Sequence, residues 1–367
     1  MKILYCDLRP KWTIKGHRNF DVKWCHLLSN VADVTLLCPE MDWYKDVDGK
    51  IDKIIYNATD ELKKRKWYDW KIWNKGNFRR LAVRDHAETN LYIKKVLELN
   101  KEKSFDYILI GALDIVSYLF YRRKLTSATK LVLIEHSADA YTKGILNRGF
   151  LRIKNDFIHI VMEKDAVKYF SDLYGINKDK IVYIPHMLNT ISAGITADVE
   201  PYDVVGISNS NDDNELQKII NLEENERFFE KMGLRAIFRS KNIEYTSTAL
   251  KIFKGRLGLS YEEYYTYVTQ AKVMVLPFSE KFGLRSSGTI VDAFSQNIPI
   301  IGNPFKTMIQ YNRIAPHICK LYTTMDELKE GLMELIEMGD NYHEEYRHFQ
   351  ETHSNGFIVE QIRKTFV

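Results

Sequence analysis

Residues 273–302, VMVLPFSEKFGLRSSGTIVDAFSQNIPIIG, hold two apolar segments separated by a polar loop and a helical pattern. Val273–Pro277 is a short run with β-branched residues that stops at a proline, which is typical of a buried parallel strand. Ser286-Ser287-Gly288 offers an N-cap hydroxyl and a residue without a Cβ, and a helical pattern follows through Gln296. Ile298–Ile301 is the next strand, so the stretch predicts a βαβ unit.

The helix start in this unit is a candidate anion site. Unpaired backbone N–H groups and the positive end of the helix dipole both favour a phosphate there. Asp292 follows Gly288 by four residues and therefore lies on the same helix face. A carboxylate repels phosphate but accepts hydrogen bonds from ribose hydroxyls. The helix start and the Asp292 carboxylate together therefore indicate a nucleoside diphosphate. The alternative is an ordinary βαβ crossover that binds no ligand.

The same residues carry a family resemblance. Asp292-Ala293-Phe294-Ser295-Gln296-Asn297-Ile298-Pro299-Ile300-Ile301 fits Glu-Ala-Met-Ala-x-Gly-x-Pro-Val-Ile, the pattern of group-4-like GT-B glycosyltransferases (glycosyltransferase group 1). In that resemblance Asp292 takes the place of the second glutamate of an E-x7-E pair, which binds the donor ribose. The first glutamate is replaced by Leu284, with Glu280 nearby. The loop resembles a Ser-Ser-Gly variant that meets the donor phosphates with backbone and serine hydroxyls.

The resemblance also implies a cationic grip on the diphosphate, and here the chain departs from the pattern. Relatives place an arginine and a lysine after the glycine that corresponds to Gly206, where this chain has Ser208–Asp213. Arg239, Lys241 and Arg285 are candidate substitutes, because arginine binds phosphate well; each is also compatible with a plain surface cation. The full set of predicted donor-binding residues is Arg285, Ser286, Ser287, Gly288, Thr289, Asp292, Arg239, Lys241, Gly255 and Arg256.

Apolar strands alternate with helical patterns over the first half of the chain, which predicts a parallel sheet. Leu131–Ile134 runs directly into Glu135-His136-Ser137-Ala138-Asp139. Carboxyl ends of parallel strands are where α/β sites form. The resemblance matches His136 to a histidine that touches the donor sugar. The predicted catalytic residues are therefore His136, Glu135 and Asp139, and Gly16 and His17 are predicted to face the acceptor.

A chain of 367 residues indicates two domains, since single cores stop growing near about 250–300 residues. The predicted class is α/β with the GT-B arrangement, two Rossmann-like domains with parallel sheets that face an interdomain cleft. Residues 1–187 form the acceptor domain, which the C-terminal helix 350–367 joins. Residues 188–202 form a linker, and 203–349 form the nucleotide-sugar donor domain.

A basic segment rich in tryptophan lies between Glu61 and Arg84, with nine basic residues against two acids. Indole rings and cations suit a membrane interface. A solvated loop whose tryptophans pack on the protein and a nucleic-acid surface are the alternatives. The predicted membrane-interface residues are Trp67, Trp70, Trp73, Lys63, Lys64, Arg65 and Lys66.

Composition is that of an ordinary globular protein, 45% hydrophobic and 28% charged, with net charge +4. The four cysteines show no metal or disulfide spacing, which predicts reduced thiols. With the resemblance, these features predict a cytoplasmic, metal-independent enzyme at the inner face of the cytoplasmic membrane. It would transfer a sugar from a nucleoside-diphosphate donor, UDP in preference to GDP, to a glycan or lipid-linked acceptor with retention, in surface polysaccharide or glycoconjugate synthesis. No cofactor, metal or nucleic acid is expected. The alternatives are a GT-B-like sugar-nucleotide epimerase and a non-catalytic membrane-associated nucleotide-binding scaffold.

Overall fold

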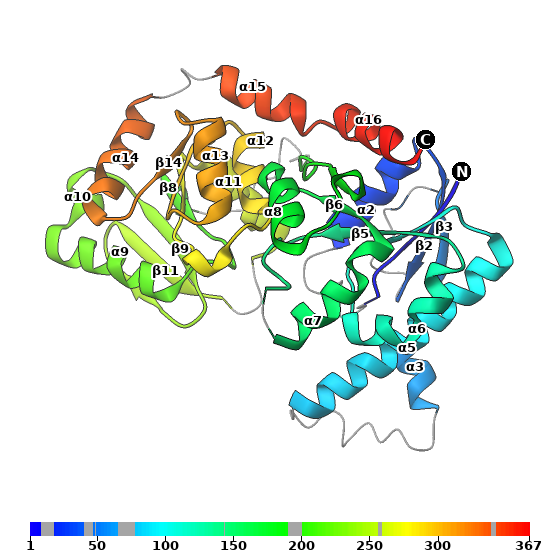
Figure 1. The fold of residues 1–367 in the computed structure, drawn as a ribbon. Coiled ribbons are helices and arrows are strands. Elements are labelled where there is room, and N and C mark those ends of the chain that lie inside the picture. The colour runs from blue at the N-terminus through cyan, green and yellow to red at the C-terminus, as the bar shows by residue number, and fades with distance from the viewer. Residues whose placement is uncertain are drawn as a thin grey trace. The chain divides into compact units, whose positions relative to one another are not determined.

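The computed structural model describes residues 1–8, 18–39, 47, 49–64, 78–142, 144–189, 200–255, 259–338 and 343–367. The chain divides into two compact units (Figure 1). Unit 1 contains Met1–Pro185 and Asn355–Val367, and unit 2 contains His186–Ser354. The chain thus enters unit 2 once and returns to unit 1 for its last helix.

Unit 1 is built on a seven-stranded parallel sheet of order β3-β2-β1-β4-β5-β6-β7. Its strands are β1 (Lys2–Cys6), β2 (Asp33–Cys38), β3 (Asp52–Ile55), β4 (Tyr107–Ile110), β5 (Lys130–Glu135), β6 (Phe157–Val161) and β7 (Ile181–Tyr183). Its helices are α2 (Arg18–Leu28), α3 (Ala58–Lys63), α5 (Phe78–Lys103), α6 (Ile115–Thr126), α7 (Gly144–Ile153), α8 (Lys164–Tyr174) and α16 (Asn355–Phe366), with 3-10 turns η3 (Lys154–Asp156) and η4 (Lys178–Lys180).

Unit 2 repeats this plan with the strand order β10-β11-β9-β8-β12-β13-β14, parallel except for the β10–β11 pair. Its strands are β8 (Val204–Gly206), β9 (Ala236–Ser240), β10 (Tyr245–Thr246), β11 (Leu250–Lys254), β12 (Val273–Leu276), β13 (Ile300–Gly302) and β14 (Cys319–Leu321). Its helices are α9 (Asp213–Glu226), α10 (Phe228–Lys231), α11 (Tyr261–Gln270), α12 (Gly288–Ser295), α13 (Lys306–Ile314), α14 (Met325–Met338) and α15 (His343–Thr352), with the 3-10 turn η5 (Glu280–Phe282).

The central strands of the second sheet are apolar on both faces. Helices therefore cover both sides of this sheet. One face packs against α11, α12, α13 and α15, and the other against α9, α10 and α14. The predicted βαβ unit of residues 273–302 is confirmed as β12, α12 and β13. A capping box at Ser260 and Glu263 starts α11 as its sequence predicts.

The predicted α/β class with parallel sheets is confirmed in both units. In each sheet the first strand of the unit lies inside the sheet, β1 beside β4 and β8 beside β12. The strand order reverses at these places, so the crossovers leave in opposite directions. Such switch points are where α/β proteins bind ligands, at the carboxyl ends of the strands.

Candidate functional site

The switch point of unit 2 brings three segments together at one edge of its sheet. β8 pairs with β9 on one side and with β12 on the other. The loop after β12 leads into α12, and Thr289 Oγ1 in the first turn of α12 donates to Ser208 Oγ, just after β8, at 3.4 Å. The helix start therefore lies over the carboxyl end of β8, where a ligand of this fold class would bind.

The start of α12 leaves polar groups without intramolecular partners. Ser287 is the N-cap residue, as the sequence predicts. Its hydroxyl, however, makes no capping hydrogen bond to the first turn of α12. Ser286 Oγ is buried and has no hydrogen-bond partner among the described residues. A Cβ added at Gly288 would meet no atom within 4 Å. The first turn is therefore open at Gly288, where backbone amide groups lie at the start of the helix, while Ser286 Oγ is enclosed beside it with an unused hydrogen-bonding capacity; this arrangement suits an anion.

The loop that precedes α12 is held by a buried threonine that the sequence analysis did not single out. Thr307, on α13, is fully buried; its hydroxyl contacts Arg285 O at 2.8 Å and Gly283 O at 3.2 Å, and Arg285 N–H donates to it at 2.9 Å. Stacked rings of Phe278 and Phe305, with centroids 5.2 Å apart, fill the space beneath the same loop. The helix start is therefore positioned by tertiary contacts before any ligand binds.

Arg239 is a buried cation without an acidic partner in the part of the chain that the structure describes. It lies in β9, directly after Ala236, Ile237 and Phe238, and is only 6% exposed. Its Nε and Nη2 groups both donate to Gly255 O, at 3.1 and 2.6 Å. Burial lowers its pKa. Since buried charges are ordinarily paired, a guanidinium in this position favours an anionic ligand.

Strand geometry places Arg239 on the same side of the sheet as α12. Ile237, two residues earlier, belongs to the core cluster that includes Ile290 of α12. Side chains at i and i+2 share a face of a strand, so Arg239 lies on that face as well. β9 and β12 flank β8 and are two strand spacings apart, about 10 Å.

Asp292 is buried and already accepts hydrogen bonds within unit 2. Tyr264 Oη, on α11, donates to Asp292 Oδ2 at 3.0 Å, and Asn189 Nδ2 donates to Asp292 Oδ1. Burial and the Asp292 charge both raise the pKa of Tyr264 well above its ordinary value, so the phenol remains a donor. A ribose hydroxyl would have to share Asp292 with these groups or replace one of them.

The other predicted donor-binding cations differ from Arg239. Lys241 follows β9 and is exposed, and its backbone N–H donates to Asp213 Oδ1 at 3.3 Å. Arg285 is exposed as well, with its guanidinium carbon 5.3 Å from the centre of the Phe282 ring. Both side chains are exposed to solvent. A cation that contacts a ligand only when the ligand binds would have the same exposure. Arg256 lies outside the described residues.

The corresponding edge of unit 1 gathers Asp7, Gly111 and His136. Asp7 follows β1 and is buried, and a Cβ at Gly111 would lie 2.2 Å from Asp7 Oδ1. His136 follows β5; its Nε2 atom is 3.1 Å from Gly111 O, and its ring meets Phe20 edge-on at 5.0 Å. His136 therefore lies at the carboxyl edge of the sheet next to the β1–β4 switch point.

The two predicted acids beside His136 have structural partners. Glu135 is buried, and its Oε1 atom is 2.9 Å from His159 Nδ1, while His159 Nε2 donates to Lys154 O at 2.7 Å. Asp139 Oδ1 accepts a short hydrogen bond from Tyr169 Oη. These bonds hold Glu135 and Asp139 in the packing around β5, β6 and α8, so His136 is the better placed of the three for chemistry.

Several sequence predictions fall outside the described residues: Gly16, His17, Arg65, Lys66, Trp67, Trp70 and Trp73. Lys63 and Lys64, at the end of α3, each pair with an acid three residues earlier, Asp60 and Glu61. Within the described ranges, no helix is both long and apolar enough to cross a bilayer. Nor do those ranges bring three or more His, Cys, Asp or Glu side chains together as a metal ion would need.

Asn211, like Thr307, was not predicted and supports the unit 2 edge. It is 2% exposed, and its Nδ2 group donates to Gly206 O at 2.6 Å and to Arg239 O at 2.8 Å. It thereby joins the loop after β8 to β9 beside Arg239. Arg239 is 28 residues from Asn211 in the sequence, so no local pattern predicts this contact.

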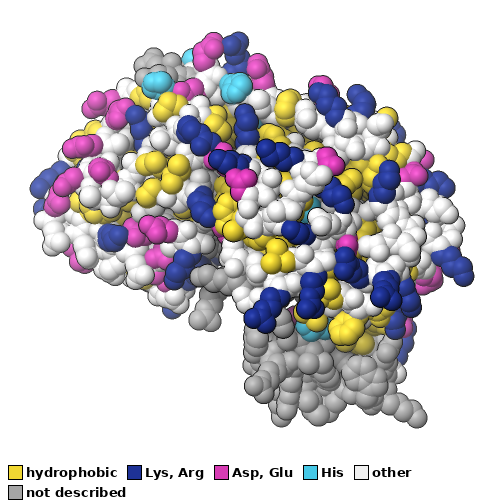
Figure 2. All heavy atoms as spheres, viewed as in Figure 1, with side chains coloured by type: hydrophobic (Ala, Val, Ile, Leu, Met, Phe, Trp, Pro, Cys, Tyr) yellow, Lys and Arg dark blue, Asp and Glu magenta, His cyan; other side chains and the backbone are white. Residues whose placement is uncertain are grey.

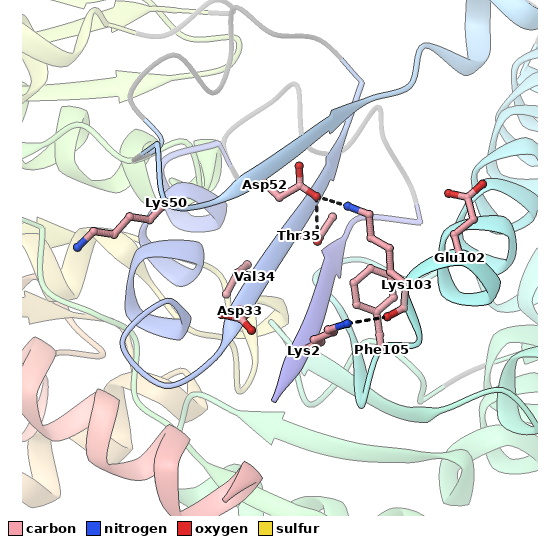
Figure 3. A pocket seen from close by; sticks show the side chains of 9 residues that line it. All are labelled: Lys2, Asp33, Val34, Thr35, Lys50, Asp52, Glu102, Lys103 and Phe105. Atoms are coloured by element: carbon pink, nitrogen blue, oxygen red, sulfur yellow. Dashed lines mark hydrogen bonds and ion pairs between the residues drawn. The ribbon is translucent and has the colours of Figure 1, made fainter.

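A cavity of about 370 Å³ in unit 1 lies at the opposite end of the sheet (Figure 3). Lys2, Asp33 and Asp52, the first residues of β1, β2 and β3, line it. Figure 3 shows Lys103 and Asp52 pointing toward each other, and they form an ion pair. The cavity adjoins the amino ends of the strands, at the opposite edge from the switch point, so it is not the candidate site.

No protein-family model matches this chain, and no curated protein matches its sequence. Solved structures are similar over the whole length. A glycosyltransferase from Rickettsia africae has a TM-score of 0.62 at 12% identity, covering 100% of this chain and 97% of that one. Sucrose-phosphate synthase from Thermosynechococcus elongatus has a TM-score of 0.64 at 10% identity, covering 99% and 98%. UDP-GlcNAc 2-epimerase from Methanocaldococcus jannaschii has a TM-score of 0.57 at 11% identity, covering 99% of each chain. The chain has the GT-B fold.

Proposed function

We propose that this chain is a glycosyltransferase that uses a nucleoside-diphosphate sugar, with the diphosphate held at the start of α12. The observation that carries the proposal is the combination, at one sheet edge, of a helix N-terminus that is open at Gly288 and the buried Arg239, which has no acid partner among the residues that the structure describes. Both features bind anions, and they lie on the same face of the sheet. The glycosyltransferases among the similar structures support the same class of reaction.

The chemistry follows from charge. Cleavage of the bond between the sugar and the diphosphate leaves an oxocarbenium-like sugar and a diphosphate that gains negative charge. Donors aimed at that charge lower the barrier, since they are oriented in advance. The amide groups of Gly288 and Thr289, the hydroxyls of Ser286 and Ser287, and Arg239 are those donors. Sugar transfer of this kind needs no metal ion, and Asp292 would accept a ribose hydroxyl.

The finer parts of the proposal rest on the family resemblance. They are a UDP donor, a glycan or lipid-linked acceptor in surface polysaccharide or glycoconjugate synthesis, retention of the anomeric configuration, and action at the inner face of the cytoplasmic membrane. NMR of the product's anomeric signal tests the stereochemistry. A product with configuration opposite to that of the donor would overturn retention and leave the transferase proposal standing.

Two glycine variants test the diphosphate site. Gly288→Ala places a methyl group in the open space at the start of α12, and Gly356→Ala does the same in the first turn of α16, where a Cβ is equally unobstructed. We expect both variants to melt at or slightly above the wild-type temperature. Only Gly288→Ala should weaken UDP binding in calorimetry. Equal UDP affinities in the wild-type protein and in both variants would remove the site from the start of α12.

A sugar-nucleotide epimerase is the second candidate, because UDP-GlcNAc 2-epimerases share the fold over the full chain. Conversion of a UDP-sugar to its epimer in the absence of any acceptor would favour it. Calorimetry that detects no binding of any nucleoside diphosphate would favour a non-catalytic scaffold whose nucleotide site is degenerate.

A further inference from the structure

The helices α6 and α7 of unit 1 lie side by side and form one surface. Gly149 of α7 faces α6 so closely that a Cβ there would be 2.7 Å from Ile115 Cγ2 and 3.8 Å from Leu119 Cδ1. The absence of a side chain at Gly149 lets the two helix backbones approach. Their outward faces therefore act as a single patch, which we call the α6–α7 surface.

Large apolar side chains project from this surface into solvent. Phe120 is 80% exposed, and Val116, four residues earlier on the same face of α6, is also exposed. Leu146 and Leu151 of α7 are 46% and 42% exposed. The two helices thus carry four of the eleven exposed large hydrophobic side chains in the described parts of the chain. Single exposed apolar residues need no explanation, but a group on two packed helices indicates an interaction surface.

Cations surround these apolar side chains, and within the described residues they have no acidic partners. Arg123, Lys124, Arg148 and Arg152 are all exposed and form no ion pair there. Neither helix contains an aspartate or a glutamate. The contrast is Arg122 on the inner side of α6, which pairs with Asp156 at 2.6 Å. Figure 2 shows basic and hydrophobic side chains interspersed over the part of unit 1 where Figure 1 places α6 and α7.

We propose that the α6–α7 surface docks on a lipid bilayer that contains anionic phospholipids. Aromatic and aliphatic side chains insert at headgroup depth, while arginine and lysine meet lipid phosphates. The charge is complementary only to an anionic partner, and the protruding phenylalanine and leucines need an apolar one. A bilayer supplies both at once. A nucleic acid would supply phosphate but offers little to the aliphatic side chains, so it is the less fitting partner.

The docking surface belongs to unit 1 and the proposed donor site to unit 2, so the docking proposal deepens the membrane part of the proposed function and fails independently of the donor site. Co-sedimentation of the full chain with phosphatidylcholine vesicles, with and without 30% phosphatidylglycerol, tests it. We expect sedimentation with the anionic vesicles alone. Arg148→Gln with Arg152→Gln should weaken the partition coefficient about 25-fold, since each surface cation contributes about fivefold. Phe120→Ser should also weaken it, because it removes the most exposed ring.

The control is Ile309→Ser, which changes an apolar side chain on α13 of unit 2 that is 44% exposed, about as exposed as Leu146 and Leu151. It should sediment as the wild type does, and all variants should keep the wild-type melting temperature and UDP affinity. Wild-type partition in both the arginine and the Phe120 variants would overturn the proposal. So would loss of binding only in a Trp67, Trp70 and Trp73 variant, which would assign membrane contact to that segment. Salt-sensitive binding of RNA without binding to vesicles would identify a nucleic-acid surface instead.

Discussion

Arg239 is a residue at which diphosphate binding and folding stability favour different side chains. Arg239 is 6% exposed, and its guanidinium makes hydrogen bonds only to the Gly255 carbonyl among the described residues. A buried charge without a counter-charge costs folding free energy, whereas a bound diphosphate would gain from it. We expect Arg239→Met to leave the free energy of unfolding unchanged or higher and to weaken UDP binding about 10- to 100-fold. Calorimetry and chemical denaturation measure the two quantities.

A second arginine serves as the control for this prediction. Arg235 pairs with Glu200 at 2.9 Å and is partly exposed, so Arg235→Met should not change UDP affinity. If Arg239→Met destabilised the protein by several kcal/mol and bound UDP normally, Arg239 would be a structural residue.

His353 is a residue whose burial makes stability depend on pH. It is 5% exposed, stacks on Phe349 at 3.8 Å, and donates from Nδ1 to Phe349 O at 2.8 Å, while Nε2 is buried without a partner in the described chain. The pKa of His353 is lowered from 6.5 to about 4, mainly by burial and to a smaller extent by His186 and His348, while the hydrogen bond to Phe349 O acts in the opposite direction. Protonation in this site is therefore unfavourable.

The pH dependence follows from the sign of that shift. Between pH 6.5 and 4 the unfolded chain binds a proton at His353 that the folded chain does not, so stability is full above pH 6.5 and falls as the pH drops. Between pH 7.5 and 5.0 the loss is about 2 kcal/mol. We expect His353→Phe to lack this component. Urea denaturation at the two pH values measures it, and an equal loss in both proteins would contradict the assignment.

At the level of elements, the loop between β12 and α12 depends on α13. Thr307→Val keeps the shape of the side chain but removes the hydroxyl that bonds Gly283 and Arg285, which should lower stability by about 1–3 kcal/mol. Binding of UDP would then have to order the loop, which should weaken UDP affinity by about 0.5–1.5 kcal/mol, or about 2- to 10-fold. Thr266→Val, at a site equally buried in α11, should leave UDP affinity unchanged. A normal affinity in Thr307→Val would show that the loop is held by other contacts.

Elements set by local pattern were predictable from the sequence, and contacts between them were not. The apolar run Val273–Leu276 and its proline define β12 within five residues, and the periodicity that follows defines α12. The hydrogen bonds that fill Asp292 come from Tyr264 and Asn189, 28 and 103 residues away. Only the fold brings these groups together. For the same reason, the sequence predicted a catalytic role for Glu135 but could not predict its contact with His159 on the neighbouring strand.

At the scale of the whole molecule, two sheets with the same crossover plan supply two switch points. The last helix, α16, returns to unit 1, where it packs against α2 and its Phe366 ring meets Tyr107 edge-on at 4.9 Å. Buried Ile358 and Ile362 make α16 part of the unit 1 core. Unit 1 thus includes a helix that follows unit 2 in the sequence.

This division of the chain predicts where a nucleotide acts. UDP bound at the start of α12 shields amide groups in the loop after β8 and in the first turn of α12, which lie in unit 2. We expect hydrogen exchange with UDP to slow at residues 206–211 and 286–290, because bound and ordered amide groups open less often. Residues 110–114 and 135–139 of unit 1 should exchange as in the free protein until an acceptor is added. The Gly288→Ala variant should lose the protection in unit 2, whereas Gly356→Ala should retain it. Protection by UDP confined to unit 1 would reverse the assignment of the donor to unit 2, because the amide groups that bind the nucleotide would then follow β1 and β4 instead of β8 and β12.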